Sequence, residues 1–259
     1  MLKLIDQKIR QAFSDAALEY DVLTSLHKEI GRELLAKLRN DDREFSFLLD
    51  VGMGTGRLTK RLAFYFPEAK VIGLDFSEGM IDVARTEDDQ FSIIQANAMQ
   101  LPFRPGSCDV IVSNLAYQWM DNLNKAFIDS HTVLKNDGRF LVTMFGHQTF
   151  HELFVTLQTI LETEALPIRR LAKREDILSA LQNAGFSEIH LDYELIKVRF
   201  PDMFGLLKWI KDIGANSLTR DFYVGKDLLN KANDYYNQNF KDRLGAYATF
   251  EVVWIDAKK

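Results

Sequence analysis

The sequence is poor in cysteine and proline and has no long apolar run. A single cysteine, Cys108, in 259 residues excludes an intramolecular disulfide framework and is typical of a reducing compartment. No apolar run approaches the ~18 residues of a membrane span. The formal net charge of -5 provides no global attraction to nucleic acid or to an anionic membrane. We therefore expect a cytoplasmic monomer that has neither nucleic acid nor membrane as a partner.

The most informative stretch is LLDVGMGTGRLT, residues 48–59. An apolar run that is typical of a buried parallel strand ends in a loop with Gly52, Gly54 and Gly56, and a helical pattern follows. This geometry brings backbone N–H groups and a helix N-terminus close to a ligand. A dinucleotide-binding loop needs its third glycine at the position of Arg57. The loop therefore favours a ligand without phosphates and argues against a dehydrogenase.

Two acids accompany this loop. Asp50 stands immediately before it, and the next apolar run, KVIGLDFS, ends in Asp75. The second acid follows the loop by roughly the ~20 residues at which a ribose-binding acid is expected. Because a carboxylate accepts hydrogen bonds from both ribose hydroxyls, we predict that Asp75 binds a nucleoside.

The hydrophobic periodicity along the chain predicts an α/β protein. Residues 5–38 have helical spacing with a break near Tyr20 and Asp21, and apolar strands alternate with helices up to position 145. Two more strands flank helical stretches within residues 200–243. We predict a single domain, 1–259, with a Rossmann-like, doubly wound, seven-stranded, mainly parallel sheet and an antiparallel last strand. Residues 1–40 form an N-terminal helical lid, and 200–243 form a helical cap insertion.

The motifs LLDVGMGTG, GLDFS, ANAMQLPF and DVIVSNLAYQW, in this order, resemble class I S-adenosylmethionine-dependent methyltransferases over roughly residues 10–145. The resemblance implies S-adenosylmethionine as cosubstrate. It also implies the residues that bind this cosubstrate: Tyr20, Asp50, Gly52, Gly54, Gly56, Asp75, Phe76, Met80, Asn97, Ala98, Asn114 and Leu115.

Three of these positions have specific roles in the resemblance. Tyr20, in an AF-x-x-AA-x-x-YD segment, lies over the methionine end, and Met80 lies at the adenine. The family commonly has aspartate where Asn97 stands. Asparagine still offers one acceptor and two donors, so it can accept from the exocyclic amine and donate to a ring nitrogen. Tyr20 and Met80 also fit helix positions that face the core.

The later stretches SNLAYQW, GHQTFHEL and LLKWIKDIGANSLTRD resemble the biotin-synthesis methyltransferases of the BioC type. That family methylates the free carboxyl group of malonyl-acyl-carrier protein. The resemblance implies an acyl-carrier protein or coenzyme A thioester as partner, and the sequence leaves both open. Another small-molecule acceptor, or an assembly-factor homologue, remains the alternative. His147 and His151 are four residues apart, but no third ligand accompanies them, so we expect no metal site.

A carboxylate is already nucleophilic at pH 7, so the expected reaction needs no general base and no dedicated catalytic residue. Five candidates to position the acceptor are Lys208, Lys211, Arg199, Tyr117 and Trp119. A separate basic cluster, Arg169, Arg170, Lys173 and Arg174, is a candidate for steering an acidic carrier protein.

Overall fold

The computed structural model describes residues 2–87, 90–166, 168–215 and 225–259. The helices are α1 Leu2–Leu23, α2 Ser25–Arg39, α3 Arg57–Tyr65, α4 Glu78–Glu87, α5 Leu123–Val133, α6 His151–Ile160, α7 Arg174–Ala184, α8 Met203–Asp212 and α9 Lys226–Asn239, with a 3₁₀ turn at Tyr117–Trp119. The strands are β1 Phe47–Val51, β2 Lys70–Asp75, β3 Ser92–Gln95, β4 Cys108–Asn114, β5 Leu134–Phe145, β6 Ser187–Phe200, β7 Lys241–Asp242 and β8 Gly245–Lys258.

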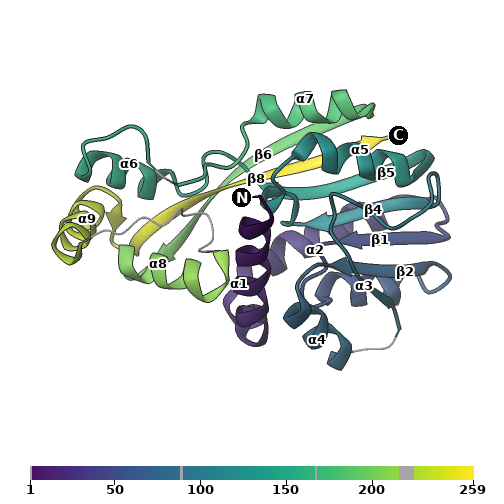
Figure 1. Ribbon diagram of the computed structural model, residues 1–259, viewed down its shortest axis with the longest axis horizontal. Helices are drawn as coiled ribbons and strands as arrows, with labels where there is room; N and C mark the ends of the chain where they lie inside the picture. Colours follow the sequence, from purple (N-terminus) through teal and green to yellow (C-terminus); the bar gives the residue numbers. More distant parts are fainter. Residues whose placement is uncertain (1, 88–89, 167, 216–224) are drawn as a thin grey trace.

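The strands form one sheet in the order β3-β2-β1-β4-β5-β8-β6, and the short β7 pairs with β8. The pairs from β3 to β5 are parallel, whereas β8 runs antiparallel to both β5 and β6. This arrangement confirms the predicted doubly wound sheet with an antiparallel last strand. The long strands β6 and β8 continue past the other strands toward α6, α8 and α9 (Figure 1).

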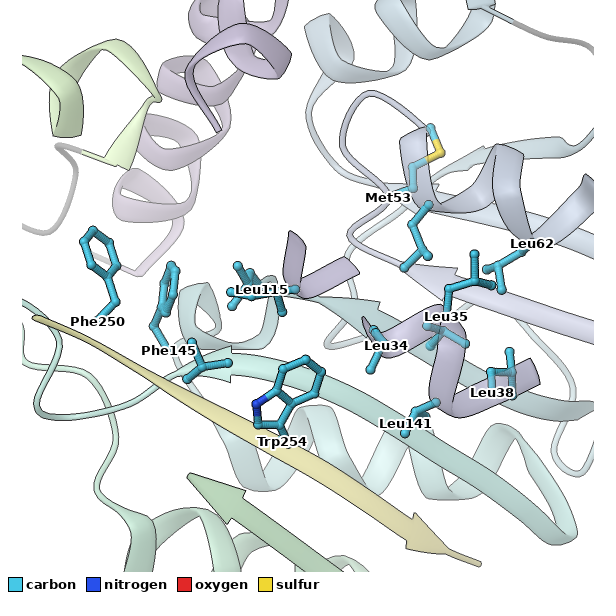
Figure 2. Close-up of a cluster of buried hydrophobic side chains, with 14 of the residues drawn as sticks. Leu34, Leu35, Leu38, Met53, Leu62, Leu115, Leu141, Phe145, Phe250 and Trp254 are labelled. Carbon is cyan, nitrogen blue, oxygen red and sulfur yellow. The ribbon is translucent and has the colours of Figure 1, made fainter. Parts of the chain in front are cut away.

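The central strands are apolar on both faces because helices cover the sheet on both sides. Consecutive side chains of a strand point to opposite faces. Accordingly, Leu48 belongs to one hydrophobic cluster and Leu49 to the other. Figure 2 shows the first cluster, where leucines of α2 lie near Leu141 of β5 and where Phe145, Phe250 and Trp254 follow. This packing fixes the carboxyl ends of β1, β2 and β4, where the loops carry polar groups.

The N-terminal segment forms two helices, as predicted, but they separate at Thr24 rather than at Tyr20. The Thr24 hydroxyl donates to the Tyr20 carbonyl oxygen at 2.6 Å. Helix α1 therefore continues for nearly one turn beyond Tyr20 before the chain changes direction. Helix α1 then packs between α4 and α8 (Figure 1). A Cβ atom on Gly214 would lie 2.7 Å from the Ala12 carbonyl oxygen, so only glycine allows the segment after α8 to approach α1 this closely.

The predicted insertion lies between β6 and β8 and contains α8, α9 and β7. Asn216, in the IGAN motif, lies outside the described residues. Helix α9 packs against α6 and α8. In the described part of the chain, no helix combines the length and the hydropathy required to cross a membrane.

Candidate functional site

Three cavities meet at the side chain of Tyr20, near the carboxyl ends of β1, β2 and β4. The strand-end cavity lies beside β2, β3 and α1, the loop cavity lies between α2 and the glycine loop, and the aromatic cavity lies toward α8. This is the edge at which open parallel sheets bind ligands. Tyr20 lines all three cavities, and Gly52 and Asn114 line the first two.

The strand-end cavity contains four of the predicted residues in one wall: Asp75, Phe76, Asn97 and Ala98. Asp75 is 8% exposed and is held by the glycine loop and by its own turn, because Gly54 N–H donates to Oδ2 at 2.9 Å and Ser77 N–H donates to Oδ1 at 2.8 Å. Burial raises the pKa of Asp75, and these backbone donors oppose the rise. With a further backbone hydrogen bond from Phe76, the carboxylate still retains a lone pair for another donor.

Asn97 uses its Oδ1 atom in its own turn, where it accepts from Met99 N–H at 2.8 Å. The amide group Nδ2 therefore remains available to a ligand, and Oδ1 keeps one lone pair. The two hydrogen bonds that the sequence predicted for this side chain are compatible with this geometry.

The glycine loop does not offer its glycine N–H groups to a ligand. Gly52 and Met53 donate to the Leu74 carbonyl oxygen, Gly54 donates to Asp75, and Gly56 donates to Met53. A pyrophosphate site needs such N–H groups free and pointing outward. A Cβ atom on Gly52, whose φ is +72°, would lie 2.2 Å from the Ala116 Cβ atom. The loop is therefore built for close backbone packing, and its geometry agrees with the prediction of a ligand without phosphates.

Asp50 lies in the loop cavity, 1% exposed, and its Oδ2 accepts a hydrogen bond from the Thr59 hydroxyl at 2.7 Å. Burial raises the pKa of this carboxyl group to about 7, the Thr59 hydroxyl opposes the rise, and the Asp75 charge adds to it. A cationic group in this cavity would favour the ionised form of Asp50.

The end of β4 carries a strained turn. Leu115 has φ +57°, a backbone conformation that is costly for a leucine. Strained conformations of this kind cluster at functional sites. The Gln118 amide nitrogen stabilises the turn by donating to the Leu115 carbonyl oxygen at 2.7 Å. The neighbouring Asn114 donates to the His27 carbonyl oxygen and accepts from the Thr143 hydroxyl, both at 2.9 Å. These bonds fix Asn114 between the first two cavities.

Three predicted cosubstrate residues lie behind these cavities rather than on their walls. Met80 is 2% exposed in the hydrophobic core, and its sulfur would lie 4.0 Å from a Cβ atom on Gly54. Gly56 caps α3 with φ +80° and faces Ala84 and Phe91. These residues, with Gly54, support the loop and line none of the three cavities.

The aromatic cavity is bounded by side chains from α1, α2, the 3₁₀ turn, β5, α8 and β8. Its described lining residues are Phe13, Tyr20, His27, Gln118, Trp119, Phe145, Thr149, Phe150, Leu171, Trp209, Ile213, Ala215 and Phe250. None of these is charged at neutral pH. Phe13 and Trp119 stand edge-to-face at 5.1 Å between ring centroids and separate this cavity from the strand-end cavity.

Of the five predicted positioning candidates, the structure brings one to these cavities. Trp119 lines two of them, but Tyr117 is fully buried in the core, where its hydroxyl lies 2.7 Å from that of Ser130. Residues two apart in a 3₁₀ turn point in different directions, so the pair cannot share a wall. The placement of Tyr117 on the cavity wall is thus wrong.

The three predicted cations also lie elsewhere. Lys208 is largely exposed and pairs with Asp212, one turn along α8, and Lys211 is exposed on the same helix. Arg199 pairs with Asp242 at 2.7 Å, between β6 and β7. None of them lines the cavities defined by the described residues, because the two lysines of α8 are exposed and the partly buried Arg199 is held by Asp242 and Tyr247.

Helix α1 is fastened to the glycine loop by Asp21. Its Oδ1 accepts from the Thr55 hydroxyl at 2.8 Å and pairs with the Arg57 guanidinium at 2.8 Å, which also donates to the Asp21 carbonyl oxygen. At the other end of the site, Trp209 Nε1 of α8 donates to the Leu23 carbonyl oxygen at 2.8 Å. These bonds hold Tyr20 over the junction of the three cavities.

Comparison with known proteins agrees with this geometry. Residues 49–142 match a family model described as a methyltransferase domain. The malonyl-[acyl-carrier protein] O-methyltransferase of Gallionella capsiferriformans is 33% identical, with 99% of this chain and 92% of the relative covered. That of Methylococcus capsulatus is 30% identical, with 93% and 90% covered. The chain belongs to the class I S-adenosylmethionine-dependent methyltransferases.

A solved structure supports the fold of this methyltransferase independently. A putative methyltransferase from Bacillus halodurans superposes with a TM-score of 0.61 at 19% identity, and 89% of this chain and 99% of that chain are covered. Membership of this family implies S-adenosylmethionine as the cosubstrate, in agreement with the resemblance of the sequence motifs. No group of three potential metal ligands occurs in residues that the structure describes.

Sequence reasoning missed several residues that line the methyltransferase site. His27 lines two cavities, Phe13 lines two, and Gln118 lines the aromatic cavity. Tyr20 belongs to α1 and His27 to α2, on either side of the break at Thr24, so helical spacing gives no signal that the two rings meet. Gln118 gives no such signal, because its position depends on the strained Leu115 turn.

Proposed function

We propose that this methyltransferase transfers the methyl group of S-adenosylmethionine to the free carboxylate of malonyl-acyl-carrier protein. The product is the methyl ester that primes pimeloyl synthesis for biotin. The observation that carries the proposal is the nearly full-length similarity to two curated malonyl-[acyl-carrier protein] O-methyltransferases, which includes the insertion between β6 and β8.

The arrangement of the cavities suggests how the cosubstrate is held. In the proposal, the strand-end cavity takes the adenosine, with Asp75 accepting from the ribose hydroxyls and with Asn97, Ala98 and Phe76 at the adenine. The loop cavity takes the methionine end, where Asp50 faces its positive charge. The cosubstrate supplies a methyl group on a sulfonium, and Tyr20 stands where that group would meet the aromatic cavity.

The chemistry of the aromatic cavity fits a carboxylate acceptor. A carboxylate attacks without a general base, and His27, which lines this cavity, has a pKa lowered to about 4 by burial and by the Arg57 charge. A group with this pKa is a weak base at pH 7. Attack of an anion on a sulfonium cancels two charges, so walls that exclude water favour it.

The predicted basic cluster bears on which carrier delivers the malonyl group. The basic cluster predicted to attract an acidic carrier protein is partly used within the fold: Arg169 pairs with Asp121 at 3.2 Å, and Arg174 pairs with the buried Glu251 at 2.7 Å. Arg170 stacks on Phe154, and Lys173 reaches Glu175 at 3.9 Å. A carrier protein would therefore meet fewer free charges here than the sequence suggested.

A panel of acceptors tests the function. Purified protein is incubated with labelled S-adenosylmethionine and with malonyl-acyl-carrier protein, malonyl-coenzyme A or acetyl-acyl-carrier protein. We expect label on the malonyl thioesters and none on the acetyl thioester, because the acetyl group has no carboxylate. Absence of label on both malonyl thioesters, while S-adenosylhomocysteine still binds, would contradict the proposed acceptor but not the fold or the cosubstrate. The acceptor would then be another small molecule.

A further inference from the structure

His27 lies between the cosubstrate side and the acceptor side of the site. It lines both the loop cavity and the aromatic cavity. Its ring contacts three aromatic rings, from Tyr20 at 5.9 Å, Phe145 at 5.5 Å and Trp209 at 6.4 Å between centroids. These rings come from α1, β5 and α8, so the imidazole is held by the same elements that bound the aromatic cavity.

The Nδ1 atom of His27 has no hydrogen-bond partner among the described residues, although the side chain is only 8% exposed. Gln118 presents a second such atom on the same cavity: it is 4% exposed, its amide nitrogen is used by Leu115, and its Oε1 is unpartnered within the described chain. Buried polar atoms are almost always paired in native proteins. Two unpaired atoms on residues that line one cavity indicate that a polar ligand completes the site.

The two atoms offer neutral hydrogen bonds rather than charge. Burial and the Arg57 charge lower the pKa of His27 to about 4, so its ring is uncharged at pH 7. In the tautomer with its proton on Nδ1, the ring donates a hydrogen bond. A carboxylate needs such a donor. The Gln118 oxygen can accept only from an N–H or O–H group, such as an amide of the arm that carries the thioester.

Building on the proposed function, we propose that His27 Nδ1–H binds one oxygen of the acceptor carboxylate and leaves the other oxygen free to attack the methyl group. A lone pair of the free oxygen forms the new C–O bond. The S–CH₃ bond breaks, and its electron pair stays on sulfur. An ester and a thioether result, both uncharged at the reacting atoms, and no proton is taken up or released.

A neutral donor suits this step better than a cation. The carboxylate loses its charge as the ester forms, so a lysine ammonium would stabilise the substrate more than the transition state. A neutral donor orients the group and binds it less tightly. This accounts for an acceptor cavity whose described walls carry neither lysine nor arginine.

Two substitutions separate this role from packing. His27→Phe keeps an aromatic ring and removes the nitrogen, whereas His27→Asn places an amide nitrogen near the position of Nδ1. His190→Phe, at an exposed position of β6, is the matched control. For malonyl-coenzyme A, we expect His27→Phe to raise KM about 10- to 100-fold with kcat changed by less than about threefold. The Kd of His27→Phe for S-adenosylhomocysteine should stay within about twofold of the wild-type value. His27→Asn should restore most of the wild-type KM, and the control should match wild type.

Each other outcome counts against a definite claim. A wild-type KM for His27→Phe overturns the role of Nδ1. A rise in acceptor KM that is matched by an equal loss of S-adenosylhomocysteine affinity, with neither restored in His27→Asn, also overturns it. Such a result indicates a packing role. If wild-type protein methylates neither malonyl thioester, the proposed function itself fails, and the wild-type measurement alone reveals this.

Discussion

Two buried carboxyl groups, Asp50 and Asp75, stand on either side of Gly52 at the carboxyl ends of β1 and β2. Both have raised pKa values because of burial, yet their surroundings differ. Asp75 accepts from two backbone N–H groups, whereas Asp50 accepts from one hydroxyl. This difference leads to separate predictions for the two residues.

Asp75→Ala should raise the Kd for S-adenosylhomocysteine by about 100-fold or more, because the proposed ribose contacts are charge-assisted hydrogen bonds. The variant also loses the acceptors for Gly54 and Ser77 N–H, so its unfolding free energy should fall by about 1–3 kcal/mol. Calorimetric titration and urea unfolding measure the two effects. Asp82→Asn, at an exposed site on α4, serves as control. Unchanged affinity in Asp75→Ala would remove the residue from the ribose site.

Asp50 should make the unliganded protein less stable as pH rises. Its pKa is about 7 in the folded chain against the ordinary value of 3.8, so the folded state holds an extra proton between these values. The free energy of unfolding therefore falls through this window. Asp50→Asn stays neutral and keeps an acceptor for Thr59. Between pH 4 and pH 8, the free energy of unfolding of this variant should rise by roughly 2–4 kcal/mol relative to that of wild type, as measured by urea unfolding. Parallel pH dependences of the two proteins would contradict this account.

At the scale of elements, α1 borders the site and is the element predicted to close it. It contributes Tyr20 and Phe13 to the cavities, and Asp21 fastens its end to the glycine loop through Thr55 and Arg57. The lid function of residues 1–40 remains a prediction, and the bonds around Asp21 show where it can be tested.

Asp21→Ala should release S-adenosylhomocysteine about 2- to 5-fold faster, because a partly exposed ion pair and one hydroxyl bond are lost. Stopped-flow fluorescence can follow this release. Asp15→Ala, which removes only an exposed partner of Gln11 on the same helix, should leave the rate unchanged. Equal rates for the two variants would show that the end of α1 is not a latch.

The elements that the sequence predicted well are those whose hydrophobic periodicity follows from which side chains are buried. The apolar strands β1, β2 and β4 and the amphipathic α2 follow directly from this pattern. The helix break at Thr24 and the inward direction of Tyr117 could not be read, because each depends on a single local hydrogen bond or turn. Boundaries and side-chain directions are decided by tertiary contacts.

At the scale of the whole molecule, the sequence predicts where the residues assigned to the cosubstrate lie, and it does not predict which residues line the aromatic cavity. The glycine loop, Asp75 and Asn97 are contiguous with strands, so their places follow from the fold. The aromatic cavity instead combines α1, α2, β5, α8 and β8, which are distant in sequence. The lysines of α8 matched a motif, yet they face away from the cavities, whereas His27 carried no motif.

The most direct test of the account is the position of the transferred methyl group. Malonyl-acyl-carrier protein is treated with the protein and S-adenosylmethionine, and the modified thioester is fragmented by mass spectrometry. We predict one methyl group on the distal malonyl carboxylate, released as methanol by mild alkali because it is an ester. A methyl group on carbon or nitrogen, or on the carrier protein itself, would contradict carboxyl methylation and the role proposed for the aromatic cavity.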